Sequence, residues 1–275
     1  MEVLTSCNNP KVKAYSALKD KKYREKTGLY LVEGIRFITE YIEAGVELEA
    51  VLFDSFGTHP DQILAIVDAC SEKGIHTYEL TGQVLAHVVD TEHSQGIVAA
   101  VRKKEFVAQT VLQIQQDVHL NSSCQDVVVI ADGIRDPGNL GTMIRSIDAV
   151  GSRALIITPG TTDPYQPKVV RAAAGSLARV PVLTMDHESI LNELHSFGYR
   201  VMSMEAHHGA SVFETDLRGP LAIVIGGEAA GISLVLQQSS DMAVSLPMPG
   251  SSESLNAGVA SAVIMYEALR QRLAK

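Results

Sequence analysis

Short apolar runs alternate with segments of helical spacing along almost the whole chain. Runs of four to six apolar residues bounded by turn formers predict buried strands. In the first part of the chain these runs lie at residues 29–32, 48–53, 75–80 and 96–101, and helices are expected near residues 35–44, 60–73 and 83–89. This alternation predicts a small α/β domain over residues 1–102.

The same alternation continues further along the chain, so a second and larger α/β domain is expected over residues 127–275. Apolar runs recur at residues 127–130, 154–157, 180–183, 199–202, 221–225 and 243–246, mostly with helical segments between them. Helix-separated strands of this kind predict a mostly parallel sheet. The intervening residues, 103–126, show little sustained periodicity and are the expected linker.

Helices are predicted at both ends of the chain. Near the N-terminus, Asn9 before Pro10 is a helix start and Gly28 is a helix stop, which together predict one basic amphipathic helix. Near the C-terminus, large and small apolar residues recur at helical spacing and predict an amphipathic helix that buries them: Leu255, Val259, Ala262, Val263, Tyr266 and Leu269.

The charge is unevenly distributed along the chain, whose formal net charge is −9. Residues 1–26 hold seven Lys or Arg against three Asp or Glu, residues 27–126 hold five against fifteen, and the remainder holds eleven against fourteen. The basic N-terminal cluster, which includes Lys11, Lys13, Lys19, Lys21 and Lys22, can attract phosphates. The alternative is an ordinary solvated helix face.

Composition narrows the class of protein. The chain has 275 residues, 46% hydrophobic and 20% charged, as expected of a globular protein with two cores. No apolar run approaches the roughly 20 residues that cross a bilayer, so a cytoplasmic protein without membrane contact is expected. Cys7, Cys70 and Cys124 are widely spaced and suggest neither a disulfide nor a zinc site, and the pair His207 and His208 has no partners for a metal site, so no metal is expected.

Three loops that follow predicted strands combine glycines with polar side chains. They span residues 132–145, 226–231 and 246–256. Ligands of open α/β sheets collect beyond the carboxyl ends of strands, so these loops are the candidate site. The first loop does not fit a dinucleotide-binding G-x-G-x-x-G turn, and the chain has no Gly-Lys pair for a P-loop. An alternative is that these residues only form turns.

Together and in this order, the loops resemble the three motifs of the SpoU (TrmH-like) family of S-adenosylmethionine-dependent RNA ribose 2′-O-methyltransferases. Asn139-Leu-Gly-Thr-Met-Ile-Arg145 matches the first motif and Gly226-Gly-Glu228-Ala-Ala-Gly231 the second. Pro247-Met248 and Ser254-Leu255-Asn256 match the third. Residues 6–13 and 31–34 also resemble the N-terminal RNA substrate-binding domain of rRNA-directed members.

The resemblance implies a fold, a reaction and partners. The fold is a C-terminal trefoil-knotted methyltransferase domain with a mostly parallel sheet, preceded by a small α/β substrate-binding domain. The reaction is methyl transfer from S-adenosylmethionine to an RNA ribose 2′-hydroxyl by a homodimer that needs no metal, with 23S ribosomal RNA favoured over tRNA. The alternatives are a tRNA 2′-O-methyltransferase, a non-catalytic RNA-binding protein of the same fold, or another α/β enzyme that acts on a nucleotide or a small acid.

The resemblance also assigns roles to individual residues. Catalytic roles are expected for Arg145, Asn139, Glu228, Ser254 and Asn256, and cofactor contacts for Gly226, Leu246, Met248 and Leu255. Arg145 either helps to deprotonate the ribose hydroxyl or binds an RNA phosphate while Ser254 or a water relays the proton. Without the resemblance, Arg145 would be interpreted as an exposed or ion-paired helix residue. Asn139, Ser254 and Asn256 would be interpreted as turn or helix-cap residues, and Leu246 and Leu255 as core residues.

Overall fold

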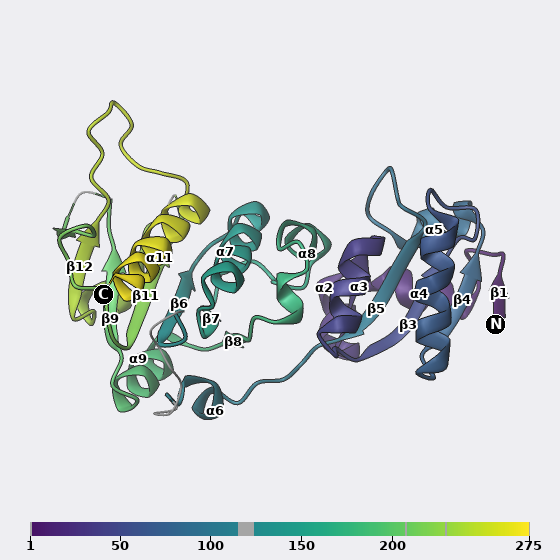
Figure 1. The fold of residues 1–275 in the computed structure, drawn as a ribbon, viewed down its shortest axis with the longest axis horizontal. Coiled ribbons are helices and arrows are strands. Elements are labelled where there is room, and N and C mark those ends of the chain that lie inside the picture. Colours follow the sequence, from purple (N-terminus) through teal and green to yellow (C-terminus); the bar gives the residue numbers. More distant parts are fainter. Residues whose placement is uncertain (1, 115–123, 207, 229, 275) are drawn as a thin grey trace. The chain divides into compact units, whose positions relative to one another are not determined.

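The computed structural model describes residues 2–114, 124–206, 208–228 and 230–274. The chain divides into two compact units, each built around one β-sheet (Figure 1). Unit 1 comprises Met1–Lys104 and Tyr165–Ala178, and unit 2 comprises Glu105–Pro164 and Arg179–Lys275. Most of the predicted linker belongs to unit 2, and residues 115–123 of that linker lie outside the described residues.

Unit 1 contains a five-stranded mixed sheet with the strand order β1-β4-β3-β5-β2. Its strands are β1 (Glu2–Leu4), β2 (Leu29–Glu33), β3 (Leu48–Phe53), β4 (His76–Leu80) and β5 (Ile97–Arg102). Its connecting helices are α3 (Ile35–Glu43), α4 (Pro60–Glu72) and α5 (Gly82–Val88), and its second segment adds α8 (Pro167–Ala172) and the 3-10 turn η3 (Ser176–Ala178). The four predicted strands and three predicted helices are confirmed with small shifts at their ends, whereas β1 was not predicted.

The prediction of one continuous N-terminal helix is wrong. The segment forms α1 (Pro10–Ser16), the 3-10 turn η1 (Ala17–Lys19) and α2 (Lys21–Thr27). Asp20 has an extended backbone, with φ −90° and ψ 133°, and its side chain accepts a hydrogen bond from the Lys22 backbone N–H at 2.9 Å. An aspartate that caps a new helix in this way ends the preceding one. The predicted start at Pro10 and stop at Gly28 are both confirmed.

Unit 2 contains a seven-stranded sheet in which every neighbouring pair is parallel. The strand order is β10-β12-β9-β11-β6-β7-β8. The strands are β6 (Val127–Asp132), β7 (Ala154–Ile157), β8 (Val182–Thr184), β9 (Arg200–Met204), β10 (Ala210–Ser211), β11 (Leu221–Gly226) and β12 (Met242–Ser245). The parallel sheet expected from the sequence is therefore confirmed, and the two-residue strand β10 was not predicted.

Helices complete unit 2. They are α6 (Ala108–Leu112), α7 (Pro137–Val150), α9 (His187–Ser196), α10 (Leu234–Gln238) and α11 (Ala257–Leu273). Leu112 of α6 is fully buried in the core beneath the sheet, so this part of the predicted linker packs into unit 2. The trefoil knot that the resemblance implies stays a prediction.

The central strands of unit 2 end at a common edge. All six residues of β6 are buried, as expected of a strand covered on both faces. Gly226, the last residue of β11, pairs with Asp132, the last residue of β6, and Ile225 pairs with Met204 at the end of β9. The loops that follow these three strands therefore emerge side by side.

Helix α11 buries a different face from the one predicted. Its buried residues are mostly small, namely Ala257, Gly258, Ser261, Ile264, Met265, Glu267 and Ala268. A Cβ atom added to Gly258 would lie 3.2 Å from the Asn139 carbonyl oxygen, so α11 approaches α7 closely. Of the predicted stripe, Leu255 precedes the helix, and Val259 and Tyr266 are about half exposed. Small residues occupy the interface between α11 and α7 because they allow the two helix backbones to approach closely.

Candidate functional site

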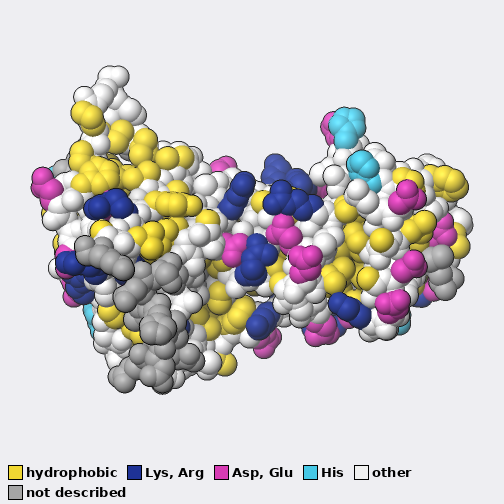
Figure 2. Space-filling model, viewed as in Figure 1, with side chains coloured by type: hydrophobic (Ala, Val, Ile, Leu, Met, Phe, Trp, Pro, Cys, Tyr) yellow, Lys and Arg dark blue, Asp and Glu magenta, His cyan; other side chains and the backbone are white. Residues whose placement is uncertain are grey.

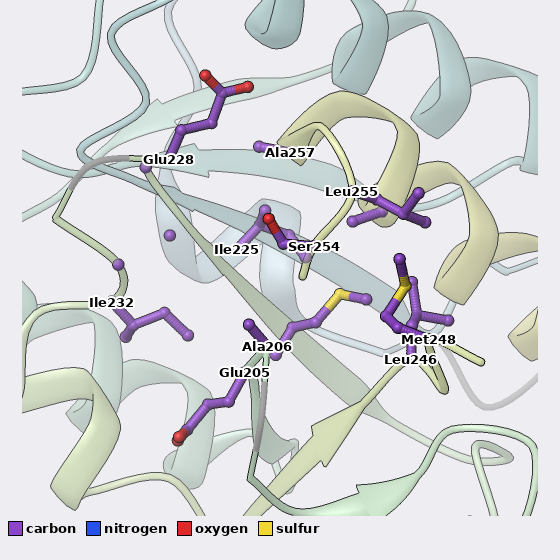
Figure 3. A pocket seen from close by; sticks show the side chains of 15 residues that line it. Glu205, Ala206, Ile225, Glu228, Ile232, Leu246, Met248, Ser254, Leu255 and Ala257 are labelled. Atoms are coloured by element: carbon purple, nitrogen blue, oxygen red, sulfur yellow. The ribbon is translucent and has the colours of Figure 1, made fainter. Parts of the chain in front are cut away.

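A pocket lies at the carboxyl edge of the unit 2 sheet, beyond the ends of β9 and β11 (Figure 3). Its cavity volume is about 200 Å³, and the cavity is partly open to solvent. Six of the residues predicted for the site line it, namely Gly226, Glu228, Leu246, Met248, Ser254 and Leu255. Segments from the second and third predicted loops therefore form one cavity.

Glycines of the loop after β11 allow the pocket wall to fold back on itself. The Gly231 backbone N–H donates a hydrogen bond to the Gly227 carbonyl at 2.8 Å. A Cβ atom on Gly226 would lie 2.3 Å from the Gly231 carbonyl carbon and 2.4 Å from the Ile232 nitrogen. Real Cβ atoms do not approach backbone this closely, so this turn requires glycine at position 226.

Three polar side chains, one from each predicted motif, meet beside the pocket. The Asn139 side-chain amide donates to Glu228 Oε1 at 2.8 Å. The Asn256 amide donates to Asn139 Oδ1 at 2.6 Å and to Glu228 Oε1 at 3.0 Å. In Figure 3 the Glu228 carboxylate points away from Ile225 and Ser254. The network therefore joins the three loops at the rim of the pocket.

Two of these residues also cap or begin helices, so the capping alternative and a site role are compatible. The Asn256 side chain accepts hydrogen bonds from the Gly258 and Val259 backbone N–H groups at the start of α11. Asn139 lies in the first turn of α7, and its backbone N–H donates to the capping side chain of Asp136 at 2.8 Å. Helix starts thus hold both amide side chains in place.

Arg145 lies apart from this network. It is an exposed residue of α7, and it is not among the residues that line the pocket. Within the described residues, no hydrogen bond or ion pair engages its guanidinium group. Ser254, by contrast, lines the pocket (Figure 3). The structure therefore brings together all the predicted catalytic side chains except Arg145.

Part of the pocket wall was not predicted. Met204 is the last residue of β9, Glu205 and Ala206 follow it, and Ile225 and Ile232 flank the glycine loop. The predicted strand at residues 199–202 could have indicated these residues. Neighbouring strands of a parallel sheet end at the same edge, so the segment after a strand beside β11 also lies at the pocket. The segment directly after that strand was not predicted because it lacks the glycines that mark the other three loops.

Asp132 is a further buried polar residue that was not assigned a role. The residue is 3% exposed and lies beneath the glycine loop at the end of β6. Burial alone would raise the pKa of the Asp132 carboxyl group. Hydrogen bonds from Ser233, Thr158 and His187 outweigh burial and hold this pKa below its ordinary value. Asp132 is therefore a carboxylate in the folded protein at neutral pH.

The basic N-terminal cluster is partly occupied by contacts within unit 1. Lys11 pairs with Glu2 and lies over the Tyr78 ring, and the Lys19 ammonium donates to the His87 carbonyl. Arg24 is buried and donates to the Leu18 and Lys19 carbonyls. The face available to an RNA phosphate is therefore smaller than the sequence predicted.

Other classes of site receive no support from the described residues. Within residues 2–114, 124–206, 208–228 and 230–274, no group of three or more His, Cys, Asp or Glu side chains is placed to hold a metal ion. His207, one of the paired histidines considered above, lies outside the described residues. No helix in the same ranges has the length and apolar character needed to cross a membrane.

Two protein-family models match the chain. The SpoU rRNA Methylase family matches residues 126–266, and the MRM3-like substrate binding domain matches residues 9–99. The first match contains all three motif loops, and the second lies within the first part of unit 1.

Curated proteins and solved structures are similar to almost the full chain. The 23S rRNA (guanosine(2553)-2′-O)-methyltransferase RlmP of Bacillus subtilis is 31% identical over 266 residues, covering 97% of this chain and 98% of that protein. The AdoMet-bound rRNA methyltransferase from Sinorhizobium meliloti has a TM-score of 0.85 at 25% identity, covering 98% and 97% of the two chains. The SpoU methyltransferase AviRb from Streptomyces viridochromogenes, in complex with AdoMet, has a TM-score of 0.81 at 28% identity, covering 97% and 99%.

Proposed function

The chain belongs to the SpoU rRNA methylase family, and from that premise we propose that it transfers the methyl group of S-adenosylmethionine to a ribose 2′-hydroxyl of 23S ribosomal RNA. The observation that carries the proposal is the glycine-walled pocket beside the Asn139–Glu228–Asn256 network, where all three motif loops meet. The names of the curated relatives support ribosomal RNA as the substrate class and guanosine as the modified nucleoside.

S-adenosylmethionine fits the residues that line the pocket. Leu246, Met248 and Leu255 offer an apolar wall for the flat adenine ring, and Gly226 allows the Gly231–Ile232 backbone to fold close against it and complete that wall. We assign cofactor binding to these four residues. The AdoMet-bound structures of similar methyltransferases support S-adenosylmethionine as the ligand. When bound, the cofactor supplies an electrophilic methyl carbon.

The protein's own contribution to the reaction is to position the ribose and to remove one proton. As the 2′-oxygen forms its bond to the methyl carbon, the bond from that carbon to sulfur breaks and the hydroxyl proton leaves. Asn139, Glu228 and Asn256 are assigned to hold the loops that shape the ribose site. Ser254 lines the pocket and is assigned to the ribose or to the proton's path.

Arg145 is assigned to the RNA. A guanidinium group keeps its proton at neutral pH, which favours a phosphate contact over direct proton abstraction. Its exposure on α7 leaves the side chain open to RNA. In the proposed arrangement Arg145 binds a phosphate next to the target ribose. The ribose 2′-hydroxyl then loses its proton, either with the help of Arg145 or through Ser254 or a water molecule.

A homodimer is part of the proposal. Hydrophobic side chains gather on the surface of unit 2 over α11 (Figure 2). Val259, Tyr266 and Leu273 of this helix are each about half exposed. An exposed apolar stripe on one helix is a common protein–protein contact.

Unit 1 is proposed to bind the RNA substrate. The match of residues 9–99 to a substrate-binding domain supports this role. Within the N-terminal cluster, the candidates for phosphate contacts are Lys13, Lys22 and Lys26. Outside that cluster, Arg102 is paired with Glu47 and Glu49. A protein that modifies ribosomal RNA is expected to act in the cytoplasm.

The proposal is tested by incubating the purified protein with methyl-labelled S-adenosylmethionine and separate pools of unmodified ribosomal RNA, assembled ribosomal particles and tRNA. Label in ribosomal RNA is the expected result. Label in tRNA alone would favour a tRNA methyltransferase, and cofactor binding without transfer to any pool would contradict the proposed reaction. Failure to bind the cofactor would favour a non-catalytic RNA-binding protein.

A further inference from the structure

Asp132 holds both ends of the loop that forms one wall of the pocket. Its backbone carbonyl accepts a hydrogen bond from the Gly227 N–H at 3.0 Å, where the loop begins. Its carboxylate Oδ2 accepts a second from the Ser233 N–H at 2.7 Å, where the loop ends at the start of α10. A single residue of β6 therefore sets where the loop over residues 227–233 leaves the sheet and where it returns.

The second carboxylate oxygen of Asp132 is fixed from other elements. Oδ1 accepts a hydrogen bond from the Thr158 hydroxyl at 2.7 Å, just after β7, and lies 3.0 Å from His187 Nε2 at the start of α9. The Gly133 N–H donates to the same Thr158 hydroxyl at 3.2 Å. A buried carboxylate with partners on both oxygens has one favourable orientation, so Oδ2 is held toward Ser233.

The loop anchored in this way carries much of the pocket wall. Gly227, Glu228, Gly231 and Ile232 all line the cavity. Glu228 also accepts the hydrogen bonds from Asn139 and Asn256 that join the motif loops. A shift of the anchored ends would therefore move the wall and the polar network together, although Asp132 is not itself a lining residue.

We propose that Asp132 is a positioning residue for the cofactor pocket, acting through the hydrogen bond that its carboxylate accepts from the Ser233 backbone N–H. His187 and Thr158 serve the carboxylate by fixing its orientation. The proposal rests on the proposed function only in naming S-adenosylmethionine as the ligand. It adds that the affinity for this ligand depends on a buried carboxylate that does not touch it.

Asp126 offers a matched control for the alternative, in which Asp132 only stabilises the fold. Asp126 is as buried as Asp132 and precedes the opposite end of the same strand. It pairs with Arg272 at 2.9 Å. Loss of either carboxylate should weaken the fold, because each leaves buried donors without a partner. Only the loss of Asp132 should change the pocket.

The test is the dissociation constant for S-adenosylmethionine of the full-length protein, measured by calorimetry for Asp132→Ala, Asp132→Asn and Asp126→Ala. We expect Asp132→Ala to weaken binding by about tenfold or more, since it removes the charged carboxylate that accepts hydrogen bonds from Ser233 and Thr158. Asp132→Asn keeps an oxygen for the Ser233 N–H and should restore binding to within about threefold. Asp126→Ala should lower the melting temperature and leave the affinity within about twofold.

Wild-type affinity in Asp132→Ala, or an equal loss in Asp126→Ala, would overturn the proposal. Hydrogen exchange of the wild-type protein is a second test that needs neither a variant nor the cofactor. The amide of Ser233, which donates to the Asp132 carboxylate, should exchange slowly without ligand, as hydrogen-bonded amides do. Exchange of the Ser233 amide at the rate of exposed loop amides would overturn the proposal. If the wild-type protein binds no cofactor, the proposed function fails, and the exchange result still decides the role of Asp132.

Discussion

Substitution of Gly226 by alanine tests whether the close folding of the second motif loop shapes the pocket. The added Cβ would lie 2.3 Å from the Gly231 carbonyl carbon, 2.4 Å from the Ile232 nitrogen and 2.6 Å from the Gly231 oxygen. All three are backbone atoms, so no side chain can rotate to relieve the overlap. The loop must move by about an ångström to reach ordinary contact distance, and overpacking of this kind costs about 1–3 kcal/mol.

The strain of Gly226→Ala is expected to appear as weaker cofactor binding, because Gly231 and Ile232 themselves line the pocket. A cost of about 1–3 kcal/mol corresponds to a rise of about 5- to 150-fold in the dissociation constant for S-adenosylmethionine, measured by calorimetry. Gly250→Ala is the control, because an added Cβ there meets nothing within 4 Å. A folded Gly226→Ala protein that binds the cofactor like the wild type would refute the reasoning.

Three further predictions concern other parts of the molecule. Asn256→Ser can still cap α11 but loses the amide that reaches Asn139 and Glu228, so methyl transfer should fall by about tenfold or more with little change in melting temperature; wild-type transfer would speak against the network. Burial raises the pKa of the Cys124 thiol to about 11, so at about pH 8 an aromatic disulfide reagent should label this thiol only after unfolding; labelling in the folded protein would contradict its burial. Tyr266→Glu places a charge in the exposed stripe of α11 and should convert a dimer to monomers in light scattering, whereas a wild-type monomer would contradict the proposed dimer.

The sequence predicted the strands of unit 2 well because a parallel sheet buried on both faces leaves continuous apolar runs, such as Val127–Asp132. It also pointed to the loops around Asn139, Glu228 and Asn256, since glycines and polar residues after a strand are local signals. The resemblance to known motifs then put these three loops into one site. Their hydrogen-bonded contact is a property of the folded chain.

The features that were missed depend on contacts between distant segments. Met204 and Glu205 reach the pocket only because β9 lies beside β11. Local periodicity predicts where strands occur but not their order in the sheet. The face that α11 buries was mispredicted because Gly258 permits a close approach to α7, which matters more there than the size of Tyr266. The break at Asp20 was missed because a helix cap competes with the helical pattern around it.

The most direct test of the central claim is the identity of the methylated nucleoside. Ribosomal RNA treated with the protein and S-adenosylmethionine is digested to nucleosides and analysed by mass spectrometry. The proposed reaction predicts a 2′-O-methylated nucleoside, with guanosine expected, and predicts its loss in an Arg145→Ala protein that still binds the cofactor. Methylation on a base, or undiminished 2′-O-methylation by Arg145→Ala, would contradict the account at the reaction or at the assigned residue, respectively.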